Sequence, residues 1–299
     1  MSYIRDDVSA KRKVGMVLTY AVLILFAILA IAPLLWLALN SFKTSQDYQM
    51  NRLGLPKRFF WQNYTQAWQR GHFGIYILNS IFYTVITTVA ILGLSFMSGF
   101  AFAKINNCNT KWMYGSYVVG ILMTLQSIMI PLFIVINQVG LYDTKLGVLI
   151  PYIGIGLPMG IYLATEFMKS IPNALVESAK LDGAGEWRIF FTIILPLLKS
   201  GLATIGLFLA LGYWNDWYNA MLYMQTESKY PLQYMLYAIQ QQTQALAQIA
   251  SQAGIQVANL PSNSLKLAMA VVATGPIVIV YPFVQRYFIA GITIGSVKG

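Results

Sequence analysis

Long apolar runs without a charged side chain constrain this chain more than any other feature. A bilayer core about 30 Å thick is crossed by about 20 helical residues, because each residue rises about 1.5 Å. Six windows meet this requirement, at residues 14–40, 75–103, 112–137, 147–168, 197–223 and 267–287. Only 10% of the 299 residues are charged, against roughly 25% in an average soluble domain. The sequence therefore predicts an all-α integral membrane protein with six transmembrane helices.

The positions of Lys and Arg predict how these spans are oriented. Six spans place both termini on one side of the membrane, and short basic loops favour the cytoplasmic side. With the N-terminal run "SAKRK" inside, more than half of the 20 basic residues are cytoplasmic. The bias is modest, because the first external loop is also basic. The loop "KINNCNTK" between the second and third spans is short and basic, so we predict an N-in, C-in topology.

Composition also limits the other classes of protein that the chain could represent. The first window could be a signal peptide, but its apolar stretch is longer than the roughly 7–15 residues of a signal core, so we interpret it as a retained span. The single cysteine, Cys108, cannot form an internal disulfide. The single histidine, His72, has no companions at ligand spacing, so no metal site is predicted. Converging nucleophiles, which an enzyme would need, are also missing.

The predicted cytoplasmic loop at residues 169–196 differs in chemistry from the rest of the chain. Pro172 suits the first turn of a helix, and Asn173 beside it is a candidate cap. Gly183 and Gly185 predict a stop or sharp bend after about ten residues. The loop is therefore expected to form a short helix, a glycine turn and a second helix, whose apolar stripe is Trp187, Phe190, Phe191 and Ile194. That stripe is expected either to re-enter the membrane or to pack on the bundle.

The first of these two helices has two interpretations. It is rich in small side chains, which would let another surface approach its backbone closely. One interpretation is an amphipathic helix at the membrane surface. The other is a helix that docks in a groove of a cytoplasmic partner. The residue types of this helix are compatible with both interpretations.

The same loop resembles a motif of a known family. "ESAKLDGAGEWRIFFTIILP" is similar to the EAA loop, E-A-A-x3-G-x9-I-x-L-P, of ABC importer permeases, and departs from it only at Ser178. The segments "NSIFYTVITTVAILGLSFMSGFAFAK" and "QRYFIAGITIGSVKG" resemble the carbohydrate-uptake, MalG-like branch, and "YPLQYML" is most similar to its LplC-type members. The resemblance extends over most of the chain from about residue 79 onward. It implies a type I ABC importer permease fold and a bacterial inner membrane location.

The resemblance also implies partners and a division of labour. The expected partners are a second, homologous permease, two ATPase subunits and an extracytoplasmic solute-binding protein. No G-x-x-x-x-G-K-[ST] phosphate loop occurs in the chain, so ATP and Mg are expected on the ATPase subunits and no cofactor on this chain. The residues implied in ATPase coupling are Glu177, Ser178, Ala179, Leu181, Asp182, Gly183 and Ala184. The C-terminal tail is implied to contact the ATPases through Gly295, Ser296, Val297, Lys298 and Gly299.

Polar residues inside the spans are candidates for the solute path, because they are costly in a bilayer. The candidates are Gln126 and the run Trp214, Asn215, Asp216, Trp217 and Tyr218. Aromatic faces beside amide and carboxylate groups suit a sugar. The alternative is that the aromatic residues form an interface belt, that Asp216 is solvated or bonded to a backbone amide, and that Gln126 hydrogen-bonds another helix.

The predicted extracytoplasmic loop at residues 225–264 is long, nearly uncharged and rich in Gln and Ala. It is either a flexible linker or, as the resemblance implies, a contact for the binding protein. The resemblance fits import of a carbohydrate, an oligosaccharide that includes modified or acidic types. The alternative function is an ion-coupled secondary transporter of a small polar solute, although such proteins usually carry ionisable residues in several spans.

Overall fold

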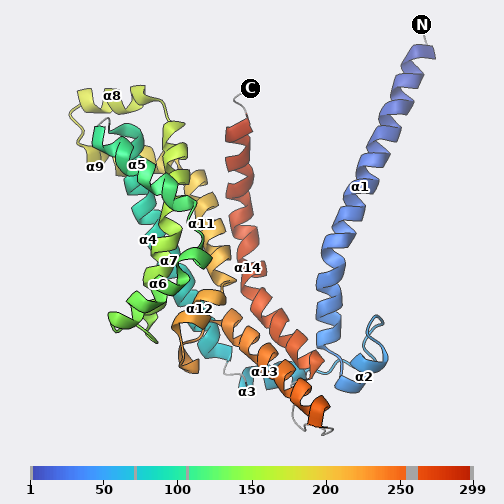
Figure 1. The fold of residues 1–299 in the computed structure, drawn as a ribbon. Helices are drawn as coiled ribbons and strands as arrows, with labels where there is room; N and C mark the ends of the chain where they lie inside the picture. Colours follow the sequence, from blue (N-terminus) through green and yellow to red (C-terminus); the bar gives the residue numbers. More distant parts are fainter. Residues whose placement is uncertain (1–2, 71–72, 106–107, 254–261, 297–299) are drawn as a thin grey trace. The chain divides into compact units, whose positions relative to one another are not determined.

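A computed structural model describes residues 3–70, 73–105, 108–253 and 262–296, and its regular structure over these residues is helical throughout (Figure 1). The chain divides into two compact units. Unit 1 contains Met1–Gly71 and Ala250–Val272, and unit 2 contains His72–Ile249 and Ala273–Gly299. The all-α fold class that the sequence predicts is confirmed.

Unit 1 begins with one long helix and continues with a structured loop. Helix α1, Tyr3–Ser41, carries the first apolar window. Two short helices follow, α2 at Ser45–Met50 and α3 at Gln62–Arg70. Thr44 begins α2 as an N-cap, because its hydroxyl accepts a hydrogen bond from the backbone N–H of Asp47 at 3.2 Å.

Unit 2 contains most of the helices. Its long helices are α4 at Phe73–Lys104, α7 at Lys145–Lys169 and α11 at Lys199–Trp214. Its other elements are α5 (Cys108–Ile121), α6 (Leu125–Gln138), α8 (Asn173–Leu181), α9 (Glu186–Arg188), a π-helix (Ile189–Ile194), α10 (Leu195–Leu197), α12 (Tyr218–Tyr223) and a 3₁₀ turn (Glu227–Lys229). Helices α13 (Leu232–Ala253) and α14 (Asn263–Ser296) have residues in both units. Figure 1 shows α8 and α9 at one end of α4 and α7.

The centre of unit 2 is the packing of α4 against α7, with α11 against both. Small residues allow this close approach. A Cβ added at Gly160 of α7 would lie 2.5 Å from Ser95 Oγ, and one at Gly99 of α4 would lie 3.1 Å from Ala164 Cβ. Ser95 and Gly99 are four residues apart, as are Gly160 and Ala164, which is the spacing of small residues at helix contacts in membranes. These pairs therefore set the separation of α4 and α7.

Three helices are long and apolar enough to cross a membrane, and they coincide with three predicted spans. They are Gly15–Ser41, Phe73–Lys104 and Lys145–Lys169. Two further apolar helix pairs, Asn109–Ile121 with Leu125–Gln138 and Glu186–Leu197 with Lys199–Trp214, are bent by 103° and 77°. The last apolar window lies in α14, where Asn263–Ile279 is a shorter apolar helix. The count of six spans and the N-in, C-in topology remain predictions.

The third and fifth predicted spans are interrupted by breaks that their apolar composition conceals. At the first break, Thr124 is extended (φ −77°, ψ 147°) and begins α6. Its hydroxyl lies 2.9 Å from Ser127 Oγ. At the second, α11 ends at Trp214, and α12 starts only at Tyr218. There the carboxylate of Asp216 accepts from the backbone N–H of Asn219 at 3.1 Å, a local side-chain to backbone bond that competes with the helix. A count of apolar residues detects neither break.

Candidate functional site

The loop that resembles the EAA motif forms α8, and its beginning is fixed to the end of α4. Pro172 is extended (φ −59°, ψ 136°) and occupies the N-cap position without a side-chain cap. The expectation that Asn173 caps the helix is wrong, because its Oδ1 accepts from Lys104 Nζ at 2.8 Å instead. The same ammonium donates to Ile171 O at 2.6 Å. One charged donor therefore holds the residues on both sides of Pro172.

The end of α8 is a Schellman motif built on Gly183. The backbone N–H of Gly183 donates to Lys180 O at 3.0 Å, and that of Ala184 donates to Ala179 O at 2.9 Å. Gly183 has a φ of +79°, a conformation that costs an L-residue roughly 1–2 kcal/mol. The stop that the sequence predicts at this glycine is confirmed, and its cause is backbone conformation.

Helix α8 presents one face to its own bundle and another outward. Val176 and Ala179 are buried in the cluster that contains Phe100, Met168 and Ile189. The remaining coupling candidates on α8 and its turn, Glu177, Ser178, Leu181, Asp182 and Gly183, are exposed, while Ala184 is half-buried. Leu181 is 89% exposed. Of the implied coupling set, Ala179 therefore faces inward, where its small side chain lets α8 lie close to its own core.

The segment after the glycine turn is a π-helix whose wide turn changes which residues are buried. Leu195 N–H donates to Phe190 O, five residues earlier. Phe190 and Ile194 are buried and pack on the bundle, whereas Trp187 and Phe191 are exposed and stack with ring centroids 6.1 Å apart. The stripe therefore packs on the bundle through Phe190 and Ile194, while re-entry of the other two aromatic residues into the membrane remains a prediction.

The exposed turn is also held by an ion pair. Lys180 Nζ lies 2.6 Å from Glu186 Oε1, and both side chains are about half exposed. Next to Glu186, an open, mostly apolar cavity of about 420 Å³ lies between α9, the π-helix and the last turns of α4, with Trp187, Phe190, Phe100 and Ile105 in its wall. The α8 end of unit 2 thus combines an exposed Leu181 with a nearby apolar recess.

Asp216 lies between α11 and α12, and protein groups bind both of its oxygens. Tyr152 OH donates to Oδ2 at 2.6 Å. The backbone N–H of Asn219 donates to Oδ2 at 3.1 Å, and its side-chain Nδ2 donates to Oδ1 at 3.1 Å. The interpretation in which a backbone amide binds this carboxylate is confirmed. Asp216 thus joins α7 to the start of α12.

The aromatic neighbours of Asp216 also make contacts within the protein. Trp214 is buried, and its indole N–H donates to Ala273 O at 3.3 Å. Trp217 stacks on Tyr237 of α13 with ring centroids 3.9 Å apart. Tyr218 OH lies 3.0 Å from the sulfur of Met129 in α6. Trp214 therefore connects the end of α11 to α14, while Trp217 and Tyr218 connect the start of α12 to α13 and α6.

The two amide candidates for the solute path are exposed. Asn215, the residue after α11, donates from Nδ2 to Leu211 O at 2.9 Å, while its Oδ1 lies 3.4 Å from Gln233 Nε2. Gln126 is exposed on the first turn of α6. Neither side chain is buried between helices, so both remain open to another molecule.

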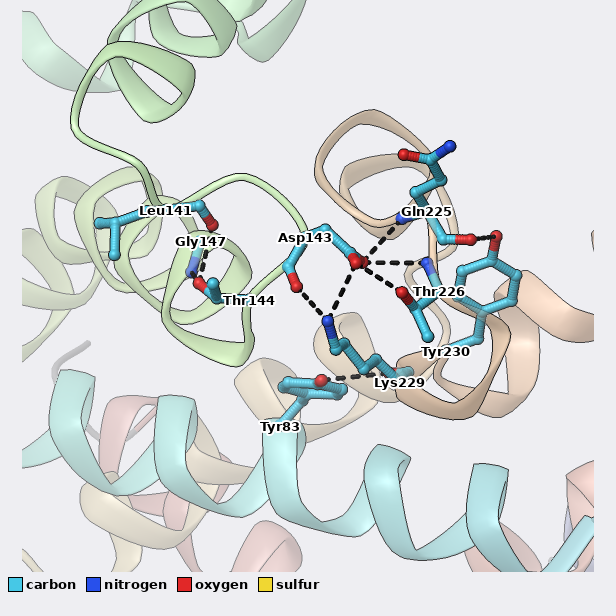
Figure 2. A network of polar contacts seen from close by, with 9 residues as sticks. All are labelled: Tyr83, Leu141, Asp143, Thr144, Gly147, Gln225, Thr226, Lys229 and Tyr230. Carbon is cyan, nitrogen blue, oxygen red and sulfur yellow. Dashed lines mark hydrogen bonds and ion pairs between the residues drawn. The ribbon is translucent and has the colours of Figure 1, made fainter.

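A network that sequence reasoning missed centres on Asp143, between α6 and α7 (Figure 2). Its Oδ1 accepts from the backbone N–H groups of Gln225 and Thr226 at 3.0 and 2.9 Å. Its Oδ2 accepts from Thr226 Oγ1 at 2.5 Å and from Lys229 Nζ at 2.9 Å. Lys229 Nζ also donates to the Asp143 backbone carbonyl. Asp143 therefore ties the segment before α13 to the start of α7.

The first turns of α4 hold the same segment from another side. Asn79 Nδ2 donates to Ser228 O at 2.9 Å and to Tyr230 O at 3.1 Å. Tyr83 OH donates to Lys229 O at 3.1 Å (Figure 2). The sequence hints at this network only through Asp143, a charged residue directly before the N-cap Thr144 of α7. Its partners are more than 80 residues away, so spacing could not reveal them.

The network shifts the acidity of Asp143 strongly. Burial alone would raise the pKa of this carboxyl, but hydrogen bonds from Thr226, Gln225 and Lys229 lower it well below its ordinary value of 3.8. Asp143 also adopts a φ of 55°, which is uncommon outside glycine. The carboxylate therefore stays ionised and bound at neutral pH.

Comparison with known proteins identifies the family. The family model described as "Binding-protein-dependent transport system inner membrane component" matches residues 95–294. The chain belongs to this family. Protein LplC of Bacillus subtilis is 34% identical over 91% of this chain and 90% of its own. The Streptomyces coelicolor "Diacetylchitobiose uptake system permease protein NgcG" is 28% identical over 94% of this chain and 88% of its own.

A solved structure agrees with the family assignment. It is the crystal structure of "a bacterial ABC transporter involved in the import of the acidic polysaccharide alginate", with a TM-score of 0.77 and 26% identity. The match covers 92% of this chain and 97% of that one. The resemblance to sugar permeases of ABC importers and the type I importer permease fold are thus confirmed, and the protein is a multi-pass membrane permease.

Two expected contact regions lie partly outside the described residues. Gly295 and Ser296 end α14, while Val297, Lys298 and Gly299 are not among the described residues. The tail contact with the ATPases therefore remains a prediction.

In the 225–264 loop, α13 forms a regular helix over Leu232–Ala253, so the flexible-linker interpretation is wrong for these residues. Residues 254–261 lie outside the described part of the chain.

Proposed function

We propose that this chain is one permease subunit of an ATP-driven importer in the bacterial cytoplasmic membrane, and that it carries an oligosaccharide into the cytoplasm. The observation that supports this most directly is α8, a short helix with an exposed outer face and an anchored inner face. Such a helix can receive the movement of another protein and pass it to the bundle. The family match and the sugar-permease relatives support the same function.

The anchoring of α8 suits it to transmit a rigid-body movement. Its beginning is bonded to Lys104 at the end of α4. Its inner face packs through Val176 and Ala179 against the cluster that includes Ala164 and Met168 of α7. A force on Leu181 would therefore move α4 and α7 with α8, because packed helices shift as units rather than deform.

The proposed assembly contains this permease, a second homologous permease, two ATPase subunits and an extracytoplasmic binding protein. ATP and Mg would bind to the ATPase subunits, and no cofactor would bind to this chain. The exposed Leu181, beside Glu177, Ser178 and Asp182, would enter a groove of one ATPase. Closure of the ATPases on ATP would then switch the permease between inward-open and outward-open states.

The solute path is proposed to involve exposed amides more than Asp216. The carboxylate of Asp216 has Tyr152 and Asn219 as partners, and the indole N–H of Trp214 is bonded to a backbone carbonyl. Asn215 and Gln126 are exposed and can donate and accept hydrogen bonds with sugar hydroxyls. Trp217 and Tyr218 would then act by positioning α12.

The proposed solute class is an oligosaccharide, including modified or acidic types. Relatives carry names that refer to uptake of diacetylchitobiose and of polygalacturonan or rhamnogalacturonan, and the solved structure belongs to an importer of alginate. The polygalacturonan and rhamnogalacturonan permease, YtcP of Bacillus subtilis, is 31% identical over 97% of this chain and 100% of its own. The names of these proteins all refer to an oligomeric or polymeric sugar.

Purification of the tagged chain from its native membrane in mild detergent tests this proposal, with copurifying proteins identified by mass spectrometry. We expect an ATPase, a second permease and a binding protein. The purified assembly in proteoliposomes should take up a radiolabelled oligosaccharide only with ATP. Recovery of this chain alone, with solute flux that needs an ion gradient and no ATP, would instead establish the secondary-transporter alternative.

A further inference from the structure

The loop that follows the first span exposes a group of large apolar side chains. In residues 50–61, the exposed members are Met50, Leu53, Leu55, Phe59 and Trp61. Leu53 is 88% exposed. Single exposed apolar residues are normal, but five large ones within one short stretch of chain are a candidate interaction surface. We call residues 51–61 the interface loop.

The conformation of the interface loop is set by buried polar groups of unit 1. Lys43 is fully buried, and its ammonium donates to Asn51 O and to Gly54 O, both at 2.6 Å. Asn63 Nδ2 donates to Ser41 O at 2.7 Å and to Lys43 O at 2.9 Å. A charged donor is thus used to hold the backbone at the tip of the loop. Leu53 is therefore exposed because these hydrogen bonds fix the backbone on both sides of it.

The interface loop folds back along the end of the membrane helix. The indole N–H of Trp36 donates to Arg52 O at 2.9 Å, and Trp36 precedes the end of α1 by about 7.5 Å at the rise of an α-helix. The backbone N–H of Phe60 donates to Phe42 O at 2.8 Å, so the end of the loop lies next to the end of α1. The apolar side chains therefore lie beside the last turns of the span.

The length of the first span places those turns in the membrane interface. Gly15–Ser41 contains 27 residues, about 40 Å of helix, whereas the hydrocarbon core is about 30 Å thick. The helix is therefore longer than the core, and the polar residues Asn40, Ser41 and Lys43 at this end favour the headgroup region for its last turn. Around Leu53, the side chains of Arg52, Lys57 and Arg58 are exposed, and they match the phosphate charge of lipid headgroups.

We propose that the interface loop is a lipid anchor. Leu53, Leu55, Phe59 and Trp61 enter the boundary between headgroups and acyl chains, while Arg52, Lys57 and Arg58 bind lipid phosphates. This arrangement of apolar and basic side chains is the one found in segments that lie in a membrane surface. The anchor would fix the depth of α1 and leave α3 outside the bilayer.

A depth measurement on the full-length chain tests this proposal. The single Cys108 is replaced by Ser, and a cysteine labelled with the fluorophore NBD is introduced at Leu53 or, as control, at Gln69, which is exposed on α3 of the same unit. Each protein is placed in nanodiscs of phosphatidylethanolamine and phosphatidylglycerol. We expect a blue-shifted label at Leu53, quenched by lipids with a shallow doxyl group and protected from iodide. The label at Gln69 should show the opposite pattern.

Two further variants separate the anchor from an accidental contact. Lys43→Met removes the donor to Asn51 and Gly54, so the Leu53 label should lose its quenching by doxyl lipids. Replacement of Arg52, Lys57 and Arg58 by Gln should weaken that quenching. Equal iodide access at Leu53 and Gln69 would overturn the proposal. Protection of Leu53 that appears only when a partner protein is added would also overturn it, since the surface would then bind protein.

Discussion

Asp143 and Thr226 are joined by two hydrogen bonds, from the Thr226 backbone N–H to Oδ1 at 2.9 Å and from its hydroxyl to Oδ2 at 2.5 Å. The two residues are separated by 83 positions in the chain. The pair connects the loop between α6 and α7 to the segment that leads into α13. That segment is consequently a fixed part of unit 2, and α13 begins from a defined position.

Asp143→Asn should destabilise the protein at neutral pH and have little effect at low pH. The substitution removes the charge bound by Lys229 and places an N–H₂ group among donors, with an expected loss of about 1–3 kcal/mol. Because the folded state lowers the pKa of Asp143 below 3.8, its stabilising contribution is full above that value and is lost as pH falls below it.

The measurement is the melting temperature of the detergent-solubilised protein and of its Asp143→Asn variant across a pH series. The difference between the two should be constant from pH 7 to about pH 5 and shrink at lower pH, where the carboxyl becomes protonated. Asp182→Asn is the control, since Asp182 is an exposed carboxylate on the turn after α8. A difference that grows as pH falls would contradict the role of Asp143.

Substitution of Gly183 should impair coupling through backbone conformation. A Cβ at Gly183 would meet nothing within 4 Å, but its φ is +79°. Gly183→Val should therefore reshape the turn after α8 and reduce ATP-driven uptake strongly, while Gly183→Asn should retain more, since Asn tolerates this conformation better. Gly185→Ala is the matched control, because Gly185 has equal space and a φ of −72°. Equal uptake by the Val and Ala variants would show that the turn is dispensable.

Gly160→Val should separate α4 from α7. Its Cβ would lie 2.5 Å from Ser95 Oγ and 2.8 Å from Ile91 Cγ2, and overpacking of this kind typically costs about 1–3 kcal/mol. Gly154→Ala on the same helix meets nothing within 4 Å and serves as the control. Thermal unfolding in detergent should show a lower melting temperature for the Gly160 variant alone. Equal melting temperatures would mean that this close contact is absent in the protein.

Asp216→Asn should lower the uptake of all solutes by a similar factor without changing solute preference. The carboxylate accepts from Tyr152 and Asn219, so its loss should disturb the α11–α12 break instead of a sugar contact. Asn215→Ala, next to it and exposed, is expected to raise KM with less effect on the maximal rate. Competition between oligosaccharides in the uptake assay checks both outcomes. A changed solute preference in the Asp216→Asn variant would show that Asp216 contacts the solute after all.

The sequence alone predicted features that depend on local composition. The apolar windows located the three long membrane helices, because a span is defined by length and lack of charge. Gly183 predicted the end of α8, since a left-handed residue at a helix end is usually glycine. The EAA resemblance identified the family from the same loop.

Features that depend on distant contacts could not be predicted in this way. Asp143 meets Thr226 and Lys229 only after folding. The resemblance implies that Ala179 belongs to the coupling set, but its side chain packs inward in the cluster with Phe100 and Met168. The 103° bend between α5 and α6 lies in an uninterrupted apolar window, so hydropathy could not reveal it.

The exposed Leu181 gives the most direct measurement of the proposed coupling. A photo-crosslinking amino acid is placed at Leu181, 89% exposed on α8, or at Val139, 64% exposed in the loop before α7. Cells are irradiated, and the adducts of this chain are identified by mass spectrometry. We predict an adduct with an ATPase subunit at Leu181 and none at Val139, and its yield should change when ATP hydrolysis is blocked by vanadate. Absence of an ATPase adduct at Leu181, in a cell where the chain supports uptake, would contradict the proposal that α8 couples this permease to ATP.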